Sequence, residues 1–301
     1  MTKEPVIVAE IGCNHKGDME VAKELIGVAA SFCKAGFVKF QKRTNKELLT
    51  KEQYNSPHPN PVNSYGDTYG AHREFLEFSQ DQHRELMQYC ETMGVGYAVS
   101  VWDVTSAKEM AALNPSYIKI PSATNQHFDV LGYLCDEFRG DIHVSLGMTT
   151  REEEARVVEF FESKKRAKDL VLYSCTSGYP VPFADLCIRE ITRLIETYKG
   201  RVKDIGFSGH HLGIAVDIAA QALGATWIER HYTLDRTWKG TDHAASLEPD
   251  GIRRLVRNTK AVAQSLTYRS KELLDIELPQ RQKLKWGEFN KQAESRPALV
   301  K

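Results

Sequence analysis

The stretch that decides the fold reads Ile-Gly-Phe-Ser-Gly-His-His over residues 205–211 and, a short segment later, Trp-Ile-Glu-Arg-His-Tyr over residues 227–232. Each half is an apolar run that ends in histidine. Alternation along an extended strand places His210 and His231 on the faces opposite the apolar residues. The segment between the two runs has the pattern of an amphipathic helix that ends at Gly224. The stretch is therefore predicted to be a strand, a helix and a second strand.

A right-handed crossover makes the two strands of such a unit parallel and close neighbours. Neighbouring strands lie about 4.8 Å apart, so His210 and His231 could bind one metal ion between them. The sequence has no closely spaced Cys or His pairs of a structural zinc site, so the site would be an open one with nitrogen and oxygen ligands. Mn²⁺, Fe²⁺, Co²⁺ and Zn²⁺ all suit such a site. The alternative is that both histidines are hydrogen-bonded structural residues.

Eight apolar runs alternate with helical patterns along the chain, which predicts a single-domain (β/α)8 TIM barrel over residues 1–270 and an irregular tail over 271–301. An open doubly wound sheet is the alternative, but no Gly-x-Gly-x-x-Gly follows the first run. Asp18, Thr105 and Thr149 are expected to cap helix starts, and Gly36, Gly94 and Gly224 to end helices. The expected strands are 5–10, 37–41, 96–101, 117–121, 141–145, 170–175, 204–208 and 226–231. The expected helices are 18–35, 80–93, 105–113, 128–138, 149–165, 184–198, 212–223 and 249–266.

Composition limits the class of protein. The 301 residues include 42% hydrophobic residues and carry a formal net charge of zero, so we expect one large core and neither a nucleic-acid surface nor an anionic-membrane surface. The six cysteines form no Cys-x-x-Cys pair and are expected to be reduced thiols in or beside core elements. No segment has the length and apolarity of a signal peptide or membrane span. These features favour the cytoplasm.

Polar residues collect at the carboxyl ends of the expected strands, where barrels of this class carry their chemistry. Alternation turns each of them into the barrel while its apolar neighbours pack on the helices. Such a set is costly to bury without a ligand, and the lysines and serines among them suit a phosphate or carboxylate. A buried Lys–Glu pair of structural origin is the alternative for any one residue. The set comprises Glu10, Lys39, Gln41, Lys119, Ser122, His143, Ser145, Ser208, His210, Glu229 and His231.

The connection over residues 42–78 is expected to be long and irregular, with three prolines and three tyrosines among its residues. A connection of this length in a compact domain is usually a lid, a binding loop or a subunit contact. A mobile surface insertion is the other interpretation.

Taken together, these residues resemble the barrel domain of the sialic acid synthase family from about residue 6 to 266. The elements Asn-His-x-Gly, Lys-Phe-Gln and Glu-Arg-His occur in the family's order, and their combination is more specific than any one of them. The matching motifs are Ala-Glu-Ile-Gly-Cys-Asn-His-Lys-Gly-Asp (9–18), Val-Lys-Phe-Gln (38–41), Ile-Lys-Ile-Pro-Ser (118–122), Ser-Leu-Gly-Met (145–148), Cys-Thr-Ser-Gly-Tyr-Pro (175–180), Gly-Phe-Ser-Gly-His (206–210) and Glu-Arg-His-Tyr (229–232).

The resemblance implies condensation of phosphoenolpyruvate with an aldose, such as an N-acylmannosamine, to give a 2-keto-3-deoxy sugar acid and phosphate. Carbon C3 of phosphoenolpyruvate would attack the aldehyde, water would add at C2, and phosphate would leave. The implied metal is a divalent ion at His210 and His231, usually Mn²⁺, with Co²⁺, Mg²⁺, Fe²⁺ and Zn²⁺ as alternatives. The implied phosphoenolpyruvate ligands are Lys39, Lys119, Ser122, Ser145, Ser177 and Ser208; Gln41, Tyr179 and Asp242 would contact the sugar, and Glu10 and Glu229 would line the reacting centre.

Three departures from the family pattern accompany the resemblance. Thr124 stands where an acid is usual, and Gly209 stands where an aspartate usually precedes the metal histidine. The sequence ends at Lys301, where an antifreeze-like domain is usual, so an acceptor without an N-acetyl group is a further expectation. A homodimer or higher homo-oligomer is possible, although that domain normally contributes to it.

Two rival functions stay open. One is a barrel synthase of the deoxyoctulosonate-phosphate or deoxyheptulosonate-phosphate kind, which would use a phosphorylated aldose. The other is a non-catalytic sensor of a sugar or phosphoenolpyruvate, for which Thr124 and the shortened pattern speak.

Overall fold

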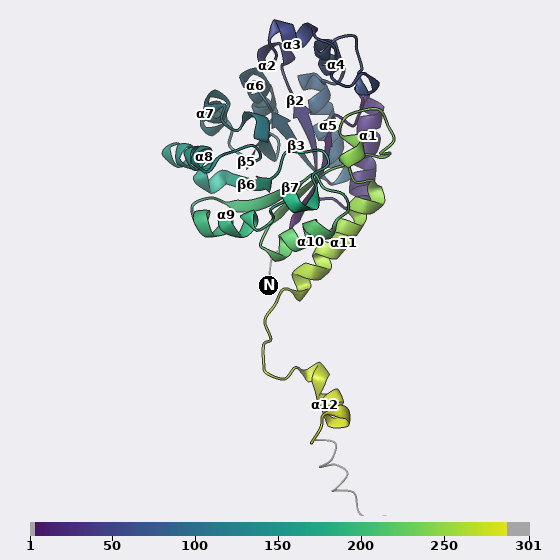
Figure 1. Cartoon of the computed structure of the whole chain (residues 1–301), viewed down its shortest axis with the longest axis vertical. Coiled ribbons are helices and arrows are strands. Elements are labelled where there is room, and N and C mark those ends of the chain that lie inside the picture. The colour runs from purple at the N-terminus through teal and green to yellow at the C-terminus, as the bar shows by residue number, and fades with distance from the viewer. Residues whose placement is uncertain (1–3, 288–301) are drawn as a thin grey trace, which may run out of the picture. The chain divides into compact units, whose positions relative to one another are not determined.

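The structure, a computed structural model, describes residues 4–287 and contains a closed barrel of eight parallel strands in sequence order (Figure 1). Strand β1 pairs with β8 as well as with β2, and this closure distinguishes the fold from an open doubly wound sheet. The predicted TIM barrel is therefore confirmed. The strands are β1 (Val6–Gly12), β2 (Phe37–Lys42), β3 (Gly96–Val101), β4 (Tyr117–Ile120), β5 (Asp141–Ser145), β6 (Leu170–Cys175), β7 (Asp204–Gly209) and β8 (Trp227–His231).

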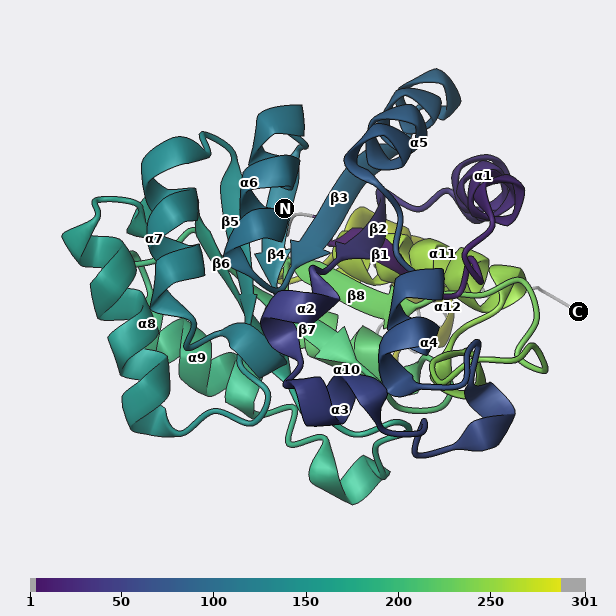
Figure 2. The same ribbon diagram turned by 90° about the horizontal axis from the view of Figure 1, so that it is seen from above.

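Helices follow every strand, and Figure 2 shows α1 and α5 to α9 placed around the strands. They pack on the outward, apolar face of the barrel, where residues such as Phe40, Ile118 and Val144 are fully buried. The helices of this unit are α1 (Met19–Val28), α2 (Asn45–Leu48), α3 (Lys51–Asn55), α4 (Tyr69–Phe75), α5 (Gln80–Met93), α6 (Val104–Leu113), α7 (Phe128–Glu137), α8 (Arg151–Ser163), α9 (Glu190–Tyr198), α10 (Ala215–Ala222) and α11 (Pro249–Ser265).

Two of the three predicted helix starts were misplaced. Asp18 caps α1 as expected, by accepting the backbone N–H groups of residues 20 and 21. For α6 the cap is Asp103 rather than Thr105, because the Asp103 carboxylate accepts the N–H of Ser106 at 2.7 Å. For α8 the cap is Thr150 rather than Thr149, since Thr150 forms a reciprocal capping box with the residue three positions later.

The predicted helix ends fared better where glycine takes a left-handed conformation. Gly94 ends α5 with φ +68°, and Gly224 follows α10 with φ +106°. Gly36 does not end the first helix, because a π-helical turn over Ala29–Cys33 is closed by Lys34 at φ +59°. Helix α9 starts later than expected, after the left-handed Cys187 at φ +46° interrupts the helical path.

The interior of the barrel is divided into an apolar layer and a polar layer above it. Inward side chains of Val8, Ala98, Tyr117, Val171, Tyr173 and Trp227 form the apolar layer. His143, predicted to point inward, lies in this layer, where its ring stacks on Tyr117 at 3.8 Å and Nδ1 lies 3.0 Å from the Tyr173 hydroxyl. The barrel is thus plugged below, and its space for a ligand lies toward the carboxyl ends of the strands.

Strand register brings the polar residues to one level. Glu10 on β1 pairs in register with Lys39 on β2 and with His231 on β8. On the other side, Ser208 on β7 pairs with Glu229 on β8. Parity and register together therefore place the predicted residues around one ring.

The connection between β2 and α5 was predicted to be irregular, and this prediction was wrong. The connection contains α2, α3, α4 and a 3-10 turn over Pro61–Asn63. These helices are short, four to seven residues, and α3 and α4 begin at capping side chains whereas α2 has none. Thr50 forms a capping box with Gln53, and Thr68 accepts the N–H of Ala71. Figure 1 shows α2, α3 and α4 together at the end of the barrel toward which β2 runs.

The chain divides into two compact units between Ala263 and Gln264, earlier than the expected boundary at residue 270. In the second unit, the described part of the expected irregular tail contains a 3-10 turn (Asp275–Glu277) and helix α12 (Leu278–Leu284). A proline in the first turn of α12 favours a helix start, which explains this local order. The predicted tail residues 288–301 lie outside the described residues. Within residues 4–287, no helix has both the length and the apolarity needed to cross a membrane.

Candidate active site

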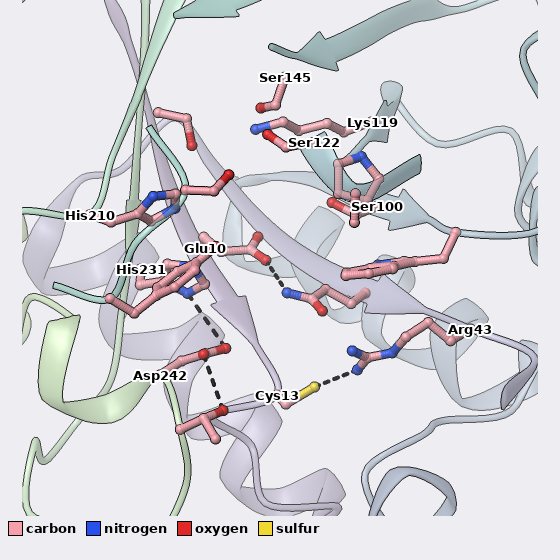
Figure 3. Close-up of a pocket in the computed structure, with 18 of the residues that line it drawn as sticks. Glu10, Cys13, Arg43, Ser100, Lys119, Ser122, Ser145, His210, His231 and Asp242 are labelled. Atoms are coloured by element: carbon pink, nitrogen blue, oxygen red, sulfur yellow. Dashed lines mark hydrogen bonds and ion pairs between the residues drawn. The ribbon is translucent and has the colours of Figure 1, made fainter. Parts of the chain in front are cut away.

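Apart from His143, which lies in the apolar layer below, the residues predicted for the site line one cavity of about 460 Å³ at the carboxyl ends of the strands. In the close-up of Figure 3, His210, His231 and Asp242 lie on one side of this pocket, and Lys119, Ser122 and Ser145 on another. The structure therefore brings the predicted residues other than His143 together. The predicted residues in its lining are Glu10, Lys39, Gln41, Lys119, Ser122, Ser145, Ser177, Tyr179, Ser208, His210, Glu229, His231 and Asp242.

Two lysines and two glutamates form the floor of the cavity. Lys39 Nζ lies 2.6 Å from Glu10 Oε2 and 3.8 Å from Glu229 Oε2, and Lys119 Nζ lies 2.5 Å from Glu229 Oε1. All four side chains are 3–7% exposed, so solvent screens these ion pairs little. Lys39 also donates to Ser100 Oγ at 2.6 Å. The floor is a charge-balanced network into which an anion can enter by sharing lysine donors.

Burial and charge act in opposite directions on this network. Burial lowers the pKa of Lys119, and the carboxylate of Glu229 opposes that change. Burial disfavours the charged form of Glu229, but the ammonium groups of Lys119 and Lys39 outweigh it and hold the pKa of Glu229 at about 2. Glu229 is therefore a carboxylate at neutral pH and a weak base. Its Oε2 atom accepts no hydrogen bond from the described residues.

Serine hydroxyls line the cavity beside Lys119. Gly147 donates its N–H to Ser122 Oγ at 3.0 Å. A Cβ atom at Gly147 would lie 2.3 Å from Ser177 Oγ and 2.6 Å from Ser122 Oγ, so glycine is needed for these hydroxyls to approach one another. Ser208 donates to Glu229 Oε1 at 3.2 Å. Hydroxyls and ammonium groups in such proximity are suited to phosphate or carboxylate oxygens.

The two histidines lie together at the ends of β7 and β8, with ring centroids 5.4 Å apart. His210 Nδ1 lies 3.1 Å from the carbonyl oxygen of Thr176, which fixes the proton on Nδ1 and leaves Nε2 as the free nitrogen. Burial, and then the neighbouring His231, lower the pKa of His210 to about 3. The imidazole is neutral at neutral pH, which is the form that binds a metal ion.

The histidine pair fits an open metal site. His231 Nδ1 is buried without a hydrogen-bond partner among the described residues, and it lies 3.9 Å from Asp242 Oδ2. Within residues 4–287, no cluster of three or more His, Cys, Asp or Glu side chains is arranged to hold a metal ion. The donor set of this site is therefore two imidazoles, and the other coordination positions would be open to substrate or water.

Gly209, which stands in place of an expected aspartate, is packed against the ring of His211. A Cβ at Gly209 would lie 2.8 Å from the Phe207 ring and 2.9 Å from His211 Cε1. His211 is buried, with Nε2 at 3.1 Å from Arg230 Nη1, and Arg230 in turn pairs with Asp217. The orientation of His210 thus comes from a backbone carbonyl instead of a carboxylate at position 209.

Thr124, the other departure within the barrel, is the last residue of a 3-10 turn (Ser122–Thr124) and is not part of the cavity lining. Its hydroxyl oxygen is buried without a hydrogen-bond partner among the described residues. The acid that is usual at this position is therefore absent, and the Thr124 side chain contributes no group to the cavity.

The sequence did not single out the residues that line the mouth of the cavity. Half of those named below come from the connection between β2 and α5, for which the sequence predicted a lid, a binding loop or a subunit contact without assigning any residue. Arg43 is held by Glu77 at 2.6 Å and by Cys13 Sγ at 2.6 Å. The proximity of charged and aromatic residues in the segment 69–73 was the available signal. The lining residues that were missed include Cys13, Arg43, His58, Tyr69, His72, Arg73, Ser100, Trp102, Met148 and Thr241.

A closed (β/α)8 barrel with ionisable residues gathered at the carboxyl ends of its strands has the organisation of a barrel enzyme. The sequence profile of the NeuB family matches residues 25–271, and the chain belongs to that family. The resemblance to the sialic acid synthase family is thereby confirmed.

Named relatives agree with this assignment. N-acetylneuraminate-9-phosphate synthase of Homo sapiens is 38% identical over 285 residues, covering 92% of this chain and 76% of the human protein. N,N'-diacetyllegionaminic acid synthase of Campylobacter jejuni is 31% identical over 266 residues, covering 88% of this chain and 78% of that protein. The crystal structure of N-acetylneuraminic acid synthetase from Leptospira borgpetersenii, in complex with citrate, has a TM-score of 0.78 and 27% identity, covering 94% of this chain and 93% of that one.

Proposed function

We propose that this chain condenses phosphoenolpyruvate with an aldose of the N-acylmannosamine type, giving a 2-keto-3-deoxy sugar acid and phosphate. The observation that carries the proposal is the lining of one cavity by two buried lysines, a group of serines and a pair of buried histidines. Membership of the NeuB family and the names of the relatives, which are synthases of sialic and legionaminic acids, support the same reaction.

Phosphoenolpyruvate would bind at the floor, where its phosphate and carboxylate replace part of the attraction between the lysines and the glutamates. Lys39 and Lys119 supply the positive charge, and Ser122, Ser145, Ser177 and Ser208 supply hydroxyl donors. The ligand would be held by charge-assisted hydrogen bonds, the stronger kind.

Glu229 would stabilise charge instead of abstracting a proton. With a pKa of about 2 it is a poor base at neutral pH, yet its Oε2 is free to accept a hydrogen bond. A carboxylate at this place favours the positive charge that develops at C2 when C3 forms the new bond, and it can orient the water that adds there. Glu10, paired with Lys39 and accepting from Gln41 Nε2 at 2.9 Å, would keep the adjacent side chains in position.

The acceptor would bind beside the histidines. His210 and His231 would hold a divalent ion, with Mn²⁺ the leading candidate; the neutral ring of His210 and the unpartnered Nδ1 of His231 fit that role. When bound, such an ion supplies a Lewis acid for the aldehyde oxygen. Tyr179, whose ring lies 4.4 Å from that of His210, and Asp242 and Gln41 would contact the sugar hydroxyls.

The test measures keto acid formation and consumption of phosphoenolpyruvate by metal-stripped protein, with and without Mn²⁺, against a panel of free and phosphorylated aldoses. We expect turnover only with both metal and one class of sugar. His210→Asn should lower turnover by about 100-fold or more, because it removes a ligand, and should also abolish Mn²⁺ binding measured by electron paramagnetic resonance.

His127→Asn is the matched control, since His127 does not line the cavity and should keep both turnover and Mn²⁺ binding. Binding of phosphoenolpyruvate without turnover on any sugar would contradict the synthase and favour the sensor. Full turnover by the metal-stripped protein would contradict the proposed metal site but not the synthase reaction.

A cytoplasmic location is part of the proposal. All six cysteines lie within the described residues and are free thiols, as expected for a reducing compartment. Cys33, Cys90 and Cys135 are buried, Cys13 and Cys175 are half-buried, and Cys187 is exposed.

A further inference from the structure

Arg230, the middle residue of the Glu-Arg-His motif, has no part in the condensation described above. It lies on β8 directly before His231 and, by alternation, on the outer face of the barrel, so it does not line the cavity. Other outward residues, such as Phe40 and Ile118, are apolar where they pack on the helices. Arg230 is nevertheless fully buried, and a buried guanidinium has to be satisfied by specific partners.

Those partners belong to the connection that follows β7. The guanidinium donates to the carbonyl oxygen of His211, to that of Gly213 at 2.8 Å and to the carboxylate of Asp217. Asp217 lies in the first turn of α10 and is itself fully buried. One side chain of β8 is therefore joined to three points along the path from β7 into α10.

The backbone of this connection has the shape that the contacts with Arg230 need. Gly213 has φ +73°, in the left-handed region, and a Cβ atom there would meet no other heavy atom within 4 Å. Backbone conformation, and not lack of space, therefore favours glycine at this position. The left-handed turn brings the Gly213 carbonyl oxygen within hydrogen-bond distance of Arg230 Nη1.

The same contacts act on both histidines of the cavity. The last residues that pair between β7 and β8 are Gly209 and Arg230, so His210 lies one residue beyond the ladder. The contact of its Nδ1 with the Thr176 carbonyl places the ring relative to β6 but not relative to β8. Arg230 supplies the connection to β8, since it binds the carbonyl of the residue after His210 and directly precedes His231.

The ion pair of Arg230 with Asp217 contributes geometry more than stability. Replacement of a buried ion pair by apolar residues of similar volume is often neutral or even stabilising, so the stability of the barrel does not explain the pair. A guanidinium directs its donors in a fixed planar fork, which sets the positions of two carbonyl oxygens at once. An apolar pair could not supply this.

We propose that Arg230 is a positioning residue that sets the separation of His210 and His231, whose ring centroids lie 5.4 Å apart (Figure 3). This inference rests on the proposed function, which assigns the two histidines to a divalent ion. Arg230 lies outside the cavity and acts by holding the segment of His210 against the strand that carries His231. An error in that separation would leave each imidazole intact but prevent both from binding one ion.

The experiment measures the Kd of Mn²⁺ for metal-stripped protein from the electron paramagnetic resonance signal of free Mn²⁺. Arg230→Met combined with Asp217→Leu removes both buried charges, so neither is left unpaired and we expect the fold to be retained. This double variant should raise the Kd of Mn²⁺ by about 10- to 100-fold, the usual effect of contacts behind metal ligands. The Kd of phosphoenolpyruvate, measured by calorimetry without metal, should stay within about threefold, because Lys39 and Lys119 are unchanged.

Arg230→Lys separates charge from geometry. Lysine keeps the pairing with Asp217 but cannot donate to two carbonyl oxygens through a planar fork. The Kd of Mn²⁺ should therefore rise by about 5- to 10-fold although the charge is retained. Melting curves check the fold of each variant, and this single variant carries the test if the double variant does not fold.

Arg166 offers a matched control at the end of the barrel where β5 and β6 begin. It pairs with Asp169 at 2.6 Å and donates to the carbonyl oxygens of residues 135, 138 and 140, so its contacts resemble those of Arg230. It does not line the cavity. Arg166→Met should lower the melting temperature and leave the Kd of Mn²⁺ unchanged.

The outcomes separate this inference from the proposed function. A wild-type Kd of Mn²⁺ in the Arg230 variants, or an equal rise in Arg166→Met, would overturn the positioning role and leave the metal site and the synthase intact. A parallel loss of Mn²⁺ and phosphoenolpyruvate binding would indicate general loosening of the site and would overturn it as well. If the wild-type protein bound no Mn²⁺, the proposed metal site itself would fail, and the inference with it.

Discussion

The floor and the mouth of the cavity are built in different ways. On the floor, Glu10, Lys39 and Lys119 extend from strands of the closed ladder, are 2% exposed, and are joined by ion pairs as short as 2.5 Å. At the mouth, His72 and Arg73 stand on a seven-residue helix inside a long connection. A side chain on a central strand is fixed by the whole sheet, whereas one on a short capped helix depends on a few local hydrogen bonds. The sheet thus fixes the floor residues, whereas the mouth residues stand on a segment held by local contacts.

The largest effect is expected on the floor. Lys119→Met should lower kcat by about 1000-fold or more, because it removes one of the two buried cations that would hold phosphoenolpyruvate. It should also lower the free energy of unfolding by about 3–5 kcal/mol, since Glu229 keeps only the more distant Lys39 as a counter-ion. Urea denaturation and consumption of phosphoenolpyruvate measure the two effects.

Two further variants check the cause of that loss. Lys119→Met combined with Glu229→Leu should regain most of the stability and none of the activity, because the uncompensated charge is gone. Lys203→Met breaks an exposed ion pair of the same 2.5 Å length and should cost at most about 1 kcal/mol. If Lys119→Met and Lys203→Met had equal free energies of unfolding, the ion pairs of the floor would contribute no more to stability than an exposed ion pair does.

A smaller effect is expected where the serines meet. Gly147→Ala should raise KM for phosphoenolpyruvate by about tenfold and leave KM for the acceptor unchanged, because its methyl group would displace the Ser122 and Ser177 hydroxyls. Gly132→Ala within α7 is the control, since its Cβ would meet only the Phe160 ring at 3.6 Å. An unchanged KM for phosphoenolpyruvate would show that the Ser122 and Ser177 hydroxyls do not bind it.

The smallest effect is expected at the mouth. The Tyr65 hydroxyl donates to the carbonyl of Lys239 at 2.5 Å and so joins the two connections that follow β2 and β8. Tyr65→Phe should raise KM for the acceptor by about two- to fivefold and leave kcat and KM for phosphoenolpyruvate unchanged. Tyr268→Phe, at a fully exposed ring, is the control. A change in KM for phosphoenolpyruvate would show that floor and mouth are coupled.

The strands and the residues they carry could be predicted because one physical rule governs both. Apolar side chains alternate with polar ones at the barrel wall, so the runs 96–101, 141–145 and 170–175 coincide with the strands of the structure. The same alternation places Lys39 and Glu229 inside, and closure of the barrel brings them within ion-pair distance. The alternation of side chains along each strand was enough to predict that Lys39 and Glu229 point into the barrel.

The mouth could not be predicted in this way. Helices α2, α3 and α4 are too short to show a period of 3.6, and their caps, such as Thr50 and Thr68, are common residues that also occur in turns. The position of Arg73 depends on its hydrogen bonds to Tyr69, four residues earlier, and on the packing of the whole connection. His143 shows the limit of parity on a strand, since it points inward as expected but lies in the apolar layer below the cavity.

A side chain at Gly209 would need space that the rings of Phe207 and His211 fill. Positions 209 and 211 are therefore epistatic, with Phe207 as a third neighbour that must also move. A lineage that acquires an aspartate at position 209 must first replace His211 by a smaller residue, and that step gives up the contact between His211 and Arg230. A large residue can return to position 211 only after position 209 is again glycine. Homologous chains should therefore divide into two groups. One group has glycine at position 209 and histidine at 211, and the other has aspartate at 209 and a small residue at 211.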